Sequence, residues 1–312
     1  MRATCLRMVH ELAVRDPRVV FVGSDLSPGL LDDMRQEMPD RWYMEGVTEA
    51  NVIGMAAGLA LEGYLPYVNT IATFITRRCY EQVAVDLCLH DLPVRLIGNG
   101  GGLVYAPLGP THLAIEDIAI MRVLPNMTVT AVCDADEMAR LMRQTLDWPH
   151  PIYIRLAKGG DPIVSEESHG FSIGKAIPMR RADDAAPAVL MSTGVMTANC
   201  LAAAEALESA GVPTSVVHFH TIKPLDVDTL LEIGARARLV VTVEEGTKIG
   251  GFGSAVTDTL VEHLGPTAPR MARIGLPDQF PHKYGSQAQQ FSLFGFMPQQ
   301  IAATVLKAVA PI

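Results

Sequence analysis

The sequence predicts an α/β protein built from two successive three-layer domains, each with a mainly parallel sheet. Its 312 residues correspond to about two domains of ordinary size. Short apolar runs alternate with helical patterns in both halves, which is typical of parallel sheets covered by helices on both faces. A polar stretch at 166–187 separates the halves, so we expect domains at 1–165 and 188–312.

The first half contains the expected strands 19–23, 94–98, 127–132 and 152–155 and the expected helices 49–63, 115–122 and 135–146. Each strand is a short apolar run, the pattern of a strand that is buried on both faces. The connection that follows contains SEESHG and RRADDAAP, and a candidate edge strand lies at 171–173.

The second half repeats the alternation. Strands are expected at 188–192, 214–219 and 239–243, and helices at 196–209, 227–235 and 254–264. Gly211 stands where a glycine commonly ends a helix. Pro224 and Asp226 are suitable residues for the start of the next helix.

The composition excludes several classes of protein. Lys and Arg number 25 and Asp and Glu 34, which gives a net charge of −9 and argues against binding to nucleic acid or a membrane surface. The longest apolar stretch, 52–61, is too short for a membrane span. No secretory signal is recognisable. Hydrophobic residues make up 49 % and charged residues 19 %, which predicts unusually extensive burial in two cores or a subunit interface.

The cysteines indicate a reducing environment. Their number is odd and they form no CxxC pair, so we expect reduced core thiols in a cytoplasmic protein and no zinc site. They are Cys5, Cys79, Cys88, Cys133 and Cys200.

Glu49 is the first candidate for chemistry, because it opens a helix among apolar neighbours. Burial raises the pKa of a carboxyl group and a helix N-terminus lowers it. Such a group suits the sharing of a proton with a bound heterocycle. The alternative is a glutamate that only stabilises the helix dipole.

The loop 98–112, GNGGGLVYAPLGPTH, is the second candidate. It follows an expected strand at the edge where α/β sheets bind their ligands, and its glycines allow close approach of a ligand. His112 is suited to bind a substrate or transfer a proton. A structural loop whose histidine caps a helix is the alternative. The glycine pattern matches no phosphate-binding motif.

Two further segments are weaker candidates. In TFITRRCYEQ, Phe74 and Tyr80 are suited to stack on a planar ring, or to pack in the core. Arg155, at the end of a strand, is suited to pair with an anionic substrate or to form a structural ion pair. For the glycine-rich turn after VEEG, we expect a role in packing or in an interface rather than in ligand binding.

Taken together, these segments resemble the transketolase family of thiamine-diphosphate enzymes. The matching blocks in the first half are GVTEANVIGMAAGLALEG, TFITRRCYEQ and GPTHLAIEDIAIMRVLPNMTV. Those in the second half are HTIKPLD, VVTVEEG, GGFGSAV and FGFMPQQIA. The resemblance covers essentially the whole chain and implies a pyrimidine-binding domain followed by a transketolase C-terminal domain.

The resemblance also implies roles for individual residues at the cofactor. Glu49 is expected to hydrogen-bond a ring nitrogen of the aminopyrimidine of thiamine diphosphate and so to activate the cofactor. Phe74 and Tyr80 are expected to stack around this ring. Asp25 and Leu26 are also expected to contact the cofactor.

The resemblance assigns a second group of residues to the substrates. His112 is expected to contact the oxygen of the donor near the reacting carbon. Glu49 and His112 are the two expected catalytic residues. Arg155 matches the position that holds an acceptor phosphate. Asn99 and Leu108 are expected to line the substrate site. No metal ligands are expected on this chain.

The family binds the diphosphate and Mg²⁺ through a separate domain with a GDG motif, which this sequence lacks. We therefore expect a split enzyme, whose second subunit supplies the diphosphate and Mg²⁺ site in a heterotetramer with two copies of each chain. The expected activity is transfer of a ketol or acyl-anion fragment from a ketone donor to an aldehyde-type acceptor.

Departures from the family pattern leave the substrate open. Leu108 replaces an acidic residue and Gly100 replaces a histidine, and both of these family residues contact sugar hydroxyls. Gly29 stands where a phosphate-binding serine is common. A pyruvate-type donor is therefore an alternative, in a 2-oxo-acid decarboxylating subunit similar to deoxyxylulose phosphate synthase or the pyruvate dehydrogenase β chain. A non-catalytic scaffold is a third interpretation.

Overall fold

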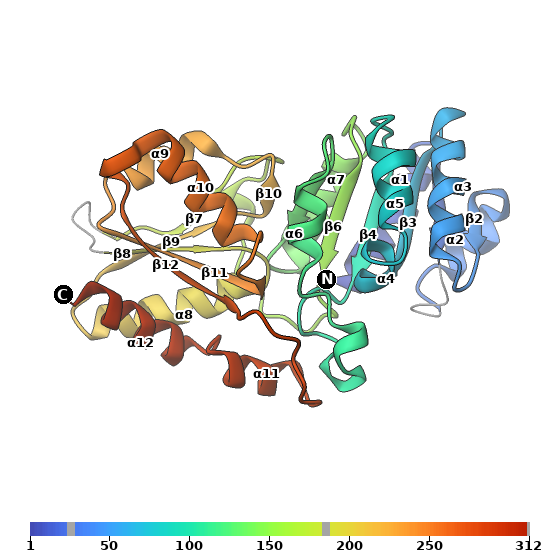
Figure 1. Ribbon diagram of the computed structural model, residues 1–312. Coiled ribbons are helices and arrows are strands. Elements are labelled where there is room, and N and C mark those ends of the chain that lie inside the picture. The colour runs from blue at the N-terminus through green and yellow to red at the C-terminus, as the bar shows by residue number, and fades with distance from the viewer. Residues whose placement is uncertain (24–28, 183–187, 311–312) are drawn as a thin grey trace.

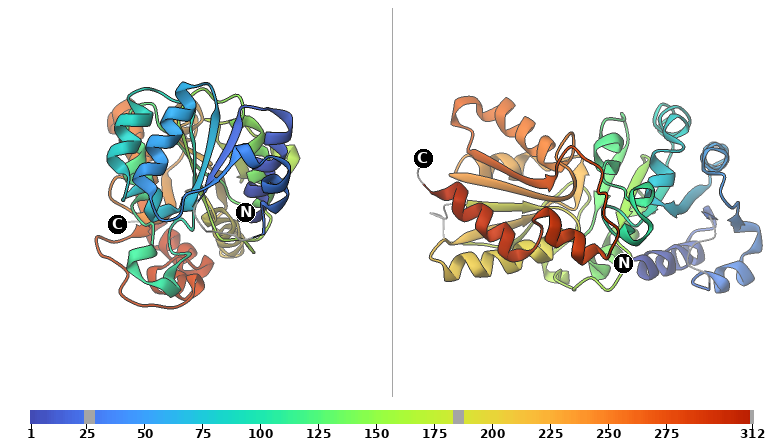
Figure 2. Two further views of the ribbon diagram at one scale, coloured as in Figure 1. Left: turned by 90° about the vertical axis from the view of Figure 1, so that its right-hand side faces the viewer. Right: turned by 60° about the horizontal axis from the view of Figure 1, so that its bottom comes forward.

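The computed structural model describes residues 1–23, 29–182 and 188–310 and shows two α/β domains that lie side by side (Figure 1). The first contains a seven-stranded sheet and the second a five-stranded sheet. Helices cover both faces of each sheet, which confirms the predicted fold class (Figure 2). No helix in the described part of the chain is long and apolar enough to cross a membrane.

The first domain follows the expected alternation. Its strands are β1 (Val19–Gly23), β2 (Trp42–Met44), β3 (Leu65–Ile71), β4 (Arg95–Asn99), β5 (Thr128–Ala131) and β6 (Ile152–Leu156). Its main helices are α1 (Arg2–Arg15), α2 (Asp32–Glu37), α3 (Glu49–Leu61), α4 (Ala72–Thr76), α5 (Tyr80–Gln82), α6 (Asp117–Arg122) and α7 (Ala135–Thr145). Short 3-10 turns are η1 (Pro39–Arg41), η3 (Ala106–Leu108) and η4 (Pro110–His112), and η2 (Val83–Cys88) is a π-helical turn.

Alternate side chains of this sheet enter two different cores. Phe21, Tyr67 and Ile154 pack against α1 and α7 on one face. Val22 and Val68 pack against α3, η2 and α6 on the other. This period of two follows from the pleat of a strand. Because both sets of alternating side chains are buried, these strands have no solvent-facing polar side.

The second domain contains β7 (Ile177–Arg180), β8 (Ala188–Ser192), β9 (Thr214–His218), β10 (Thr221–Lys223), β11 (Leu239–Thr247) and β12 (Arg270–Leu276). Its helices are α8 (Met196–Ser209), α9 (Val227–Gly234), α10 (Phe252–Leu264), α11 (Gln287–Phe294) and α12 (Pro298–Val309), with 3-10 turns η5 (Glu167–His169) and η6 (Gly265–Thr267). The sheet order is β12-β11-β8-β9-β7. Helices α8 and α12 cover one face, and α9 and α10 the other.

Local signals at the helix ends act as expected in this domain. Gly211 follows α8 with a φ of 77°, a conformation that glycine adopts without steric cost. The carboxylate of Asp226 accepts a hydrogen bond from the Thr229 amide and caps α9.

The expected edge strand at 171–173 is wrong. The edge strand is β7, which lies inside the stretch expected as a connection and pairs antiparallel with β9. Strand β7 has only four residues, Ile177–Arg180, and contains Pro178, so its local strand signal is weak.

Strand β10 joins the two domains. It belongs to the second half of the chain but pairs antiparallel with β5, at the edge of the seven-stranded sheet. The core on the α3 face of that sheet also continues into the second domain, where it includes residues of α9 and α10. The two domains therefore share both a sheet edge and a core.

Arg155 forms a second connection between the domains. Its Nε donates to Asp117 Oδ2 at 2.7 Å, and its Nη2 donates to the backbone oxygen of Glu245 in β11 at 2.7 Å. The hydroxyl of Tyr153 donates to the same Asp117 oxygen at 2.8 Å. Arg155 is 5 % exposed and Asp117 1 %. A buried pair of this kind is favourable only because further hydrogen bonds complete it.

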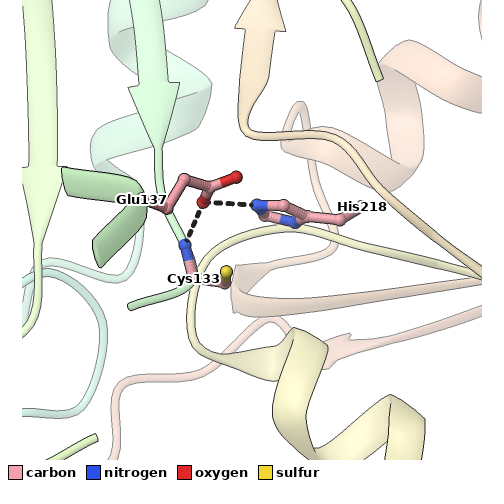
Figure 3. Close-up of side chains that lie close together, drawn as sticks. All are labelled: Cys133, Glu137 and His218. Atoms are coloured by element: carbon pink, nitrogen blue, oxygen red, sulfur yellow. Dashed lines mark hydrogen bonds and ion pairs between the residues drawn. The ribbon is translucent and has the colours of Figure 1, made fainter. Parts of the chain in front are cut away.

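A third connection is a buried cluster of Cys133, Glu137 and His218 (Figure 3). Glu137 Oε2 accepts from the Cys133 amide at 2.6 Å and pairs with His218 Nε2 at 2.9 Å. Thr197 Oγ1 lies 2.8 Å from the other ring nitrogen of His218. The potential metal-ligating atoms lie within 4.8 Å of one another. Because Glu137 and His218 are already paired with each other, we interpret the cluster as a buried hydrogen-bonded contact between the domains.

Low pH should destabilise the contact between the two domains through His220. This histidine is buried and lies two residues after His218. Burial lowers the pKa of His220 to about 4, although the nearby Glu137 opposes the shift. The unfolded chain therefore binds a proton between pH 6.5 and 4 that the folded chain does not, and stability falls as the pH drops through this window. We expect the free energy of unfolding to fall by about 3 kcal/mol between pH 6.5 and pH 4.

The measurement is the urea-unfolding midpoint of the chain as a function of pH, compared with the variant His220→Phe. The variant keeps a ring to stack on Phe171, whose ring centroid lies 4.1 Å away. Its midpoint should change less between pH 7 and pH 4. Burial also tends to raise the pKa of Glu137, but the charge and hydrogen bond of His218 lower it to about 2, so its contribution is lost only at more acidic pH. Identical pH profiles would show that His220 does not titrate in this way.

The substitution Gly102→Ala should destabilise the chain. Gly102 has a φ of 65°, and an added Cβ would lie 2.5 Å from Glu245 Cδ and 2.8 Å from Arg155 Nη2. We expect a loss of about 2 kcal/mol or more in unfolding free energy. The control is Gly58→Ala in α3, where nothing lies within 4 Å of the added Cβ and helix propensity predicts a gain of up to about 1 kcal/mol. Equal stability of the two variants would contradict the tight contact at Gly102.

Candidate functional site

Glu49 begins α3 and points into a small, mostly apolar cavity. Its side chain is 7 % exposed, and its Oε1 has no hydrogen-bond partner among the described residues. Arg78 Nη1 lies 3.5 Å from the other oxygen, Oε2. The cavity is also lined by Gly46, Val52, Ile53, Val68, Asn69, Thr70 and Ile75. A buried carboxylate oxygen without a partner is costly, so it indicates a position for a hydrogen-bond donor from a ligand.

Arg78 connects Glu49 to the next two candidates. Its guanidinium carbon lies 3.5 Å from the centroid of the Phe74 ring. The Phe74 ring meets the ring of His112 edge to face, with centroids 5.3 Å apart. The structure therefore brings Glu49, Phe74 and His112 into one site, although they come from three separate segments.

His112 ends η4 in the loop after β4. Its Nδ1 lies 2.9 Å from Thr111 Oγ1, which leaves the other ring nitrogen for a ligand. Partial burial and the charges of Arg78 and Arg77 lower the pKa of His112. A lowered pKa keeps the imidazole neutral at pH 7, so it can donate or accept a hydrogen bond.

Tyr80 is held away from this group. Its hydroxyl donates to the backbone oxygen of Ile120 at 2.7 Å, and its ring packs against the core beneath α6. This placement favours the packing alternative over stacking on a ligand.

Asn99 and Leu108 differ in their exposure to solvent. Asn99 is fully buried and donates from Nδ2 to Asn69 Oδ1 and to the Thr70 backbone oxygen. Its own Oδ1 has no hydrogen-bond partner within residues 1–23, 29–182 and 188–310. Leu108 is 50 % exposed at the end of η3. Neither contacts Glu49 through a hydrogen bond. Asp25 and Leu26 lie outside the described residues.

Arg155 does not present its guanidinium to this site. Its hydrogen bonds go to Asp117 and to the backbone of Glu245, as described above. This placement favours the structural ion pair, and we do not assign a phosphate of the acceptor to Arg155.

Sequence reasoning missed the contribution of Arg78 and Asn69. Both residues lie in or next to segments that were singled out, but their types gave no signal. Only the fold shows that Arg78 lies between Phe74 and Glu49, and that Asn69 joins Asn99 across neighbouring strands.

Two family models match the chain. The model described as transketolase, pyrimidine binding domain matches residues 1–160, and the one described as transketolase, C-terminal domain matches residues 174–301. Together they cover most of both domains.

Among curated proteins, a similar one is the 6-deoxy-6-sulfo-D-fructose transketolase subunit SqwH of Clostridium sp. (strain MSTE9). The two are 33 % identical over 297 residues, which cover 93 % of this chain and 91 % of that protein. The 1-deoxy-D-xylulose-5-phosphate synthase of Gloeothece citriformis (strain PCC 7424) is 34 % identical over 305 residues, 96 % of this chain. The chain spans about half of that synthase, 46 % of its length.

Solved structures give the same assignment. A split gene transketolase, described as an inactive beta4 tetramer, superposes with a TM-score of 0.89 and 32 % identity, covering 99 % of this chain and 97 % of that one. A transketolase variant from Pichia stipitis shares the fold with a TM-score of 0.81 at 20 % identity, covering 98 % of this chain and 45 % of that one. On the two domain matches and these relatives, the chain belongs to the transketolase family.

Proposed function

We propose that this chain is the smaller subunit of a two-chain, thiamine-diphosphate-dependent enzyme of the transketolase type. It takes part in moving a ketol fragment from a ketone donor to an aldehyde-type acceptor. The observation that carries the proposal is the buried Oε1 of Glu49, which has no partner among the described residues, in a site where Arg78 links Glu49 to Phe74 and His112.

The residues present fit the aminopyrimidine half of thiamine diphosphate. Glu49 Oε1 can accept a hydrogen bond from a protonated ring nitrogen, inside a cavity whose other walls are mainly apolar. The Phe74 ring lies on the other side of Arg78 from Glu49 and is suited to pack against the cofactor ring. When bound, thiamine diphosphate supplies the carbanion chemistry that cleaves a bond next to a carbonyl. Glu49 orients the cofactor and controls the proton on that ring nitrogen.

His112 is suited to the substrate. A neutral imidazole at the edge of the Phe74 ring can hydrogen-bond the oxygen on the reacting carbon of the donor. The His112 side chain is only partly buried, so a donor can approach its ring from the solvent side.

A partner subunit completes the proposed enzyme. We assign the diphosphate and Mg²⁺ to a second chain, in a cytoplasmic heterotetramer with two copies of each chain. The names of two similar proteins, a transketolase subunit and a split gene transketolase, support this arrangement. Exposed apolar side chains on α3, on η2 and directly after η2 are suited to an interface; they include Leu61, Val85 and Leu89.

A 2-oxo-acid donor such as pyruvate is the second candidate. The similarity to 1-deoxy-D-xylulose-5-phosphate synthase supports it. So does Leu108, an apolar side chain in the loop that carries His112, because it cannot hydrogen-bond the hydroxyls of a sugar.

The substitution Glu49→Gln should reduce kcat of the reconstituted enzyme by roughly 10²–10⁴-fold, because a neutral amide cannot balance the protonated ring nitrogen. The measurement is ketol transfer by this chain mixed with its partner, thiamine diphosphate and Mg²⁺. The control is Glu62→Gln, at the exposed end of the same helix, which should retain full activity. Full activity of the Glu49 variant would exclude the proposed mechanism.

The donor can be identified with two probes, xylulose 5-phosphate and pyruvate, each tested with an aldehyde acceptor that receives the fragment. A ketose donor should be cleaved without release of CO₂, because the bond broken joins two sugar carbons. Pyruvate would be consumed with release of one CO₂ per turnover and would favour the second candidate. Failure of the complex to bind thiamine diphosphate in calorimetry would indicate a scaffold and reject both enzyme functions.

A further inference from the structure

Two adjacent glutamates near the end of β11 have the same chemistry but face different domains. Glu244 accepts from the amides of Phe252 and Gly253, both at 2.8 Å, and so holds the start of α10 within its own domain. Glu245 Oε1 accepts from the Leu103 amide at 2.8 Å, in the loop after β4 of the first domain. Successive side chains of a strand point to opposite sides, which explains the division.

The hydrogen bonds of Glu245 join three segments. Besides the Leu103 amide, its Oε1 accepts from Gln287 Nε2, at the start of α11, at 2.7 Å. Glu245 is 2 % exposed, and Gly102 lets it approach the loop, since an added Cβ would overlap its carboxyl group. The carboxylate is therefore an acceptor shared between the loop of the first domain and a helix of the second.

A second contact holds the same loop farther along. The ring of Tyr284, just before α11, packs against Gly109, where an added Cβ would lie 2.7 Å from the ring. Figure 1 and the left view of Figure 2 show the η3–η4 segment beside α11. The stretch from Leu103 to His112 is thus fixed by the second domain at both of these points.

We propose that Glu245 is a positioning residue for the substrate loop: by holding the Leu103 amide, it sets the place of His112 next to Phe74. The inference rests on the proposed function, because His112 matters only if the site turns over a donor. Glu245 itself touches neither the Glu49 cavity nor His112, so it acts through the loop.

Glu245 and the control residue Glu244 are both almost fully buried. Burial raises the pKa of Glu245 to about 7, although the charge of Arg155 and the hydrogen bonds from Gln287 and Leu103 oppose the shift. A buried carboxyl group with a raised pKa costs folding free energy at neutral pH. Burial raises the pKa of Glu244 to about 7 as well, so the two glutamates differ in the segment that each holds and not in this cost.

The first experiment measures hydrogen exchange in the full chain without the partner. Glu245→Leu should increase amide exchange in peptides from 100–112 by at least roughly tenfold, which corresponds to loss of one hydrogen bond of about 1.4 kcal/mol. Glu244→Leu is the matched control and should increase exchange at the start of α10 instead. Equal exchange of the loop in both variants would overturn the inference.

The second experiment uses the reconstituted complex with xylulose 5-phosphate and, separately, pyruvate. For whichever donor the wild type uses, Glu245→Leu should raise KM about tenfold with the Kd of thiamine diphosphate unchanged. Glu245→Gln should restore KM, because its amide oxygen still accepts from Leu103. An unchanged KM, or a KM raised equally by Glu244→Leu, would overturn the inference.

The exchange and kinetic experiments together distinguish failure of the inference from failure of the proposed function. If the wild-type complex turns over neither donor, the proposed function fails, and the exchange measurement still decides whether Glu245 holds the loop. If the wild type is active and the Glu245 variants match it, only the inference fails. Should Glu245→Leu not fold, Gln287→Leu removes one hydrogen bond of the same carboxylate, and it should raise loop exchange and KM in the same direction.

Discussion

The buried pair of Arg155 and Asp117 is the constraint on which the arrangement of the two domains depends. Arg155 comes from β6 in the interior of the first sheet, and its Nη2 donates to the backbone of β11 in the second domain. A charged group so deeply buried must keep its partners, since an unpaired charge costs several kcal/mol. The second sheet is therefore fixed where β11 can supply a carbonyl oxygen, and the Glu245 side chain next to it reaches the loop that carries His112.

Much of the fold follows from the sequence because burial on both faces leaves a strong apolar signal. The expected strand 188–192 and helix 196–209 have the same bounds as β8 and α8. The central strand β3 was not expected, because Pro66 and the polar pair Asn69 and Thr70 interrupt its apolar run. Strand β10 could not be expected either, since its partner β5 lies in the other domain, and pairing across domains leaves no local pattern.

The site was predictable in part, and the reason differs between residues. Glu49, Phe74 and His112 carry chemistry by residue type and lie in segments with a family resemblance, and the fold brings them together. Arg155 is equally suited to bind a substrate by residue type, yet in the structure it bonds Asp117 and the backbone of Glu245 and so connects the two domains. Sequence cannot distinguish these cases, because the partners of a charged side chain depend on tertiary contacts. Arg78 and Asn69 were missed for the same reason.

The pairing of β10 with β5 has a consequence for how this protein can be divided. If the two halves were made as separate polypeptides, β5 would become an edge strand with unpaired amides and carbonyls. Exposed edges of this kind promote aggregation. The apolar core that crosses between the halves would be opened by the same cut. Expression of either half alone should therefore give insoluble material, and recombination within this family should exchange both halves as one block.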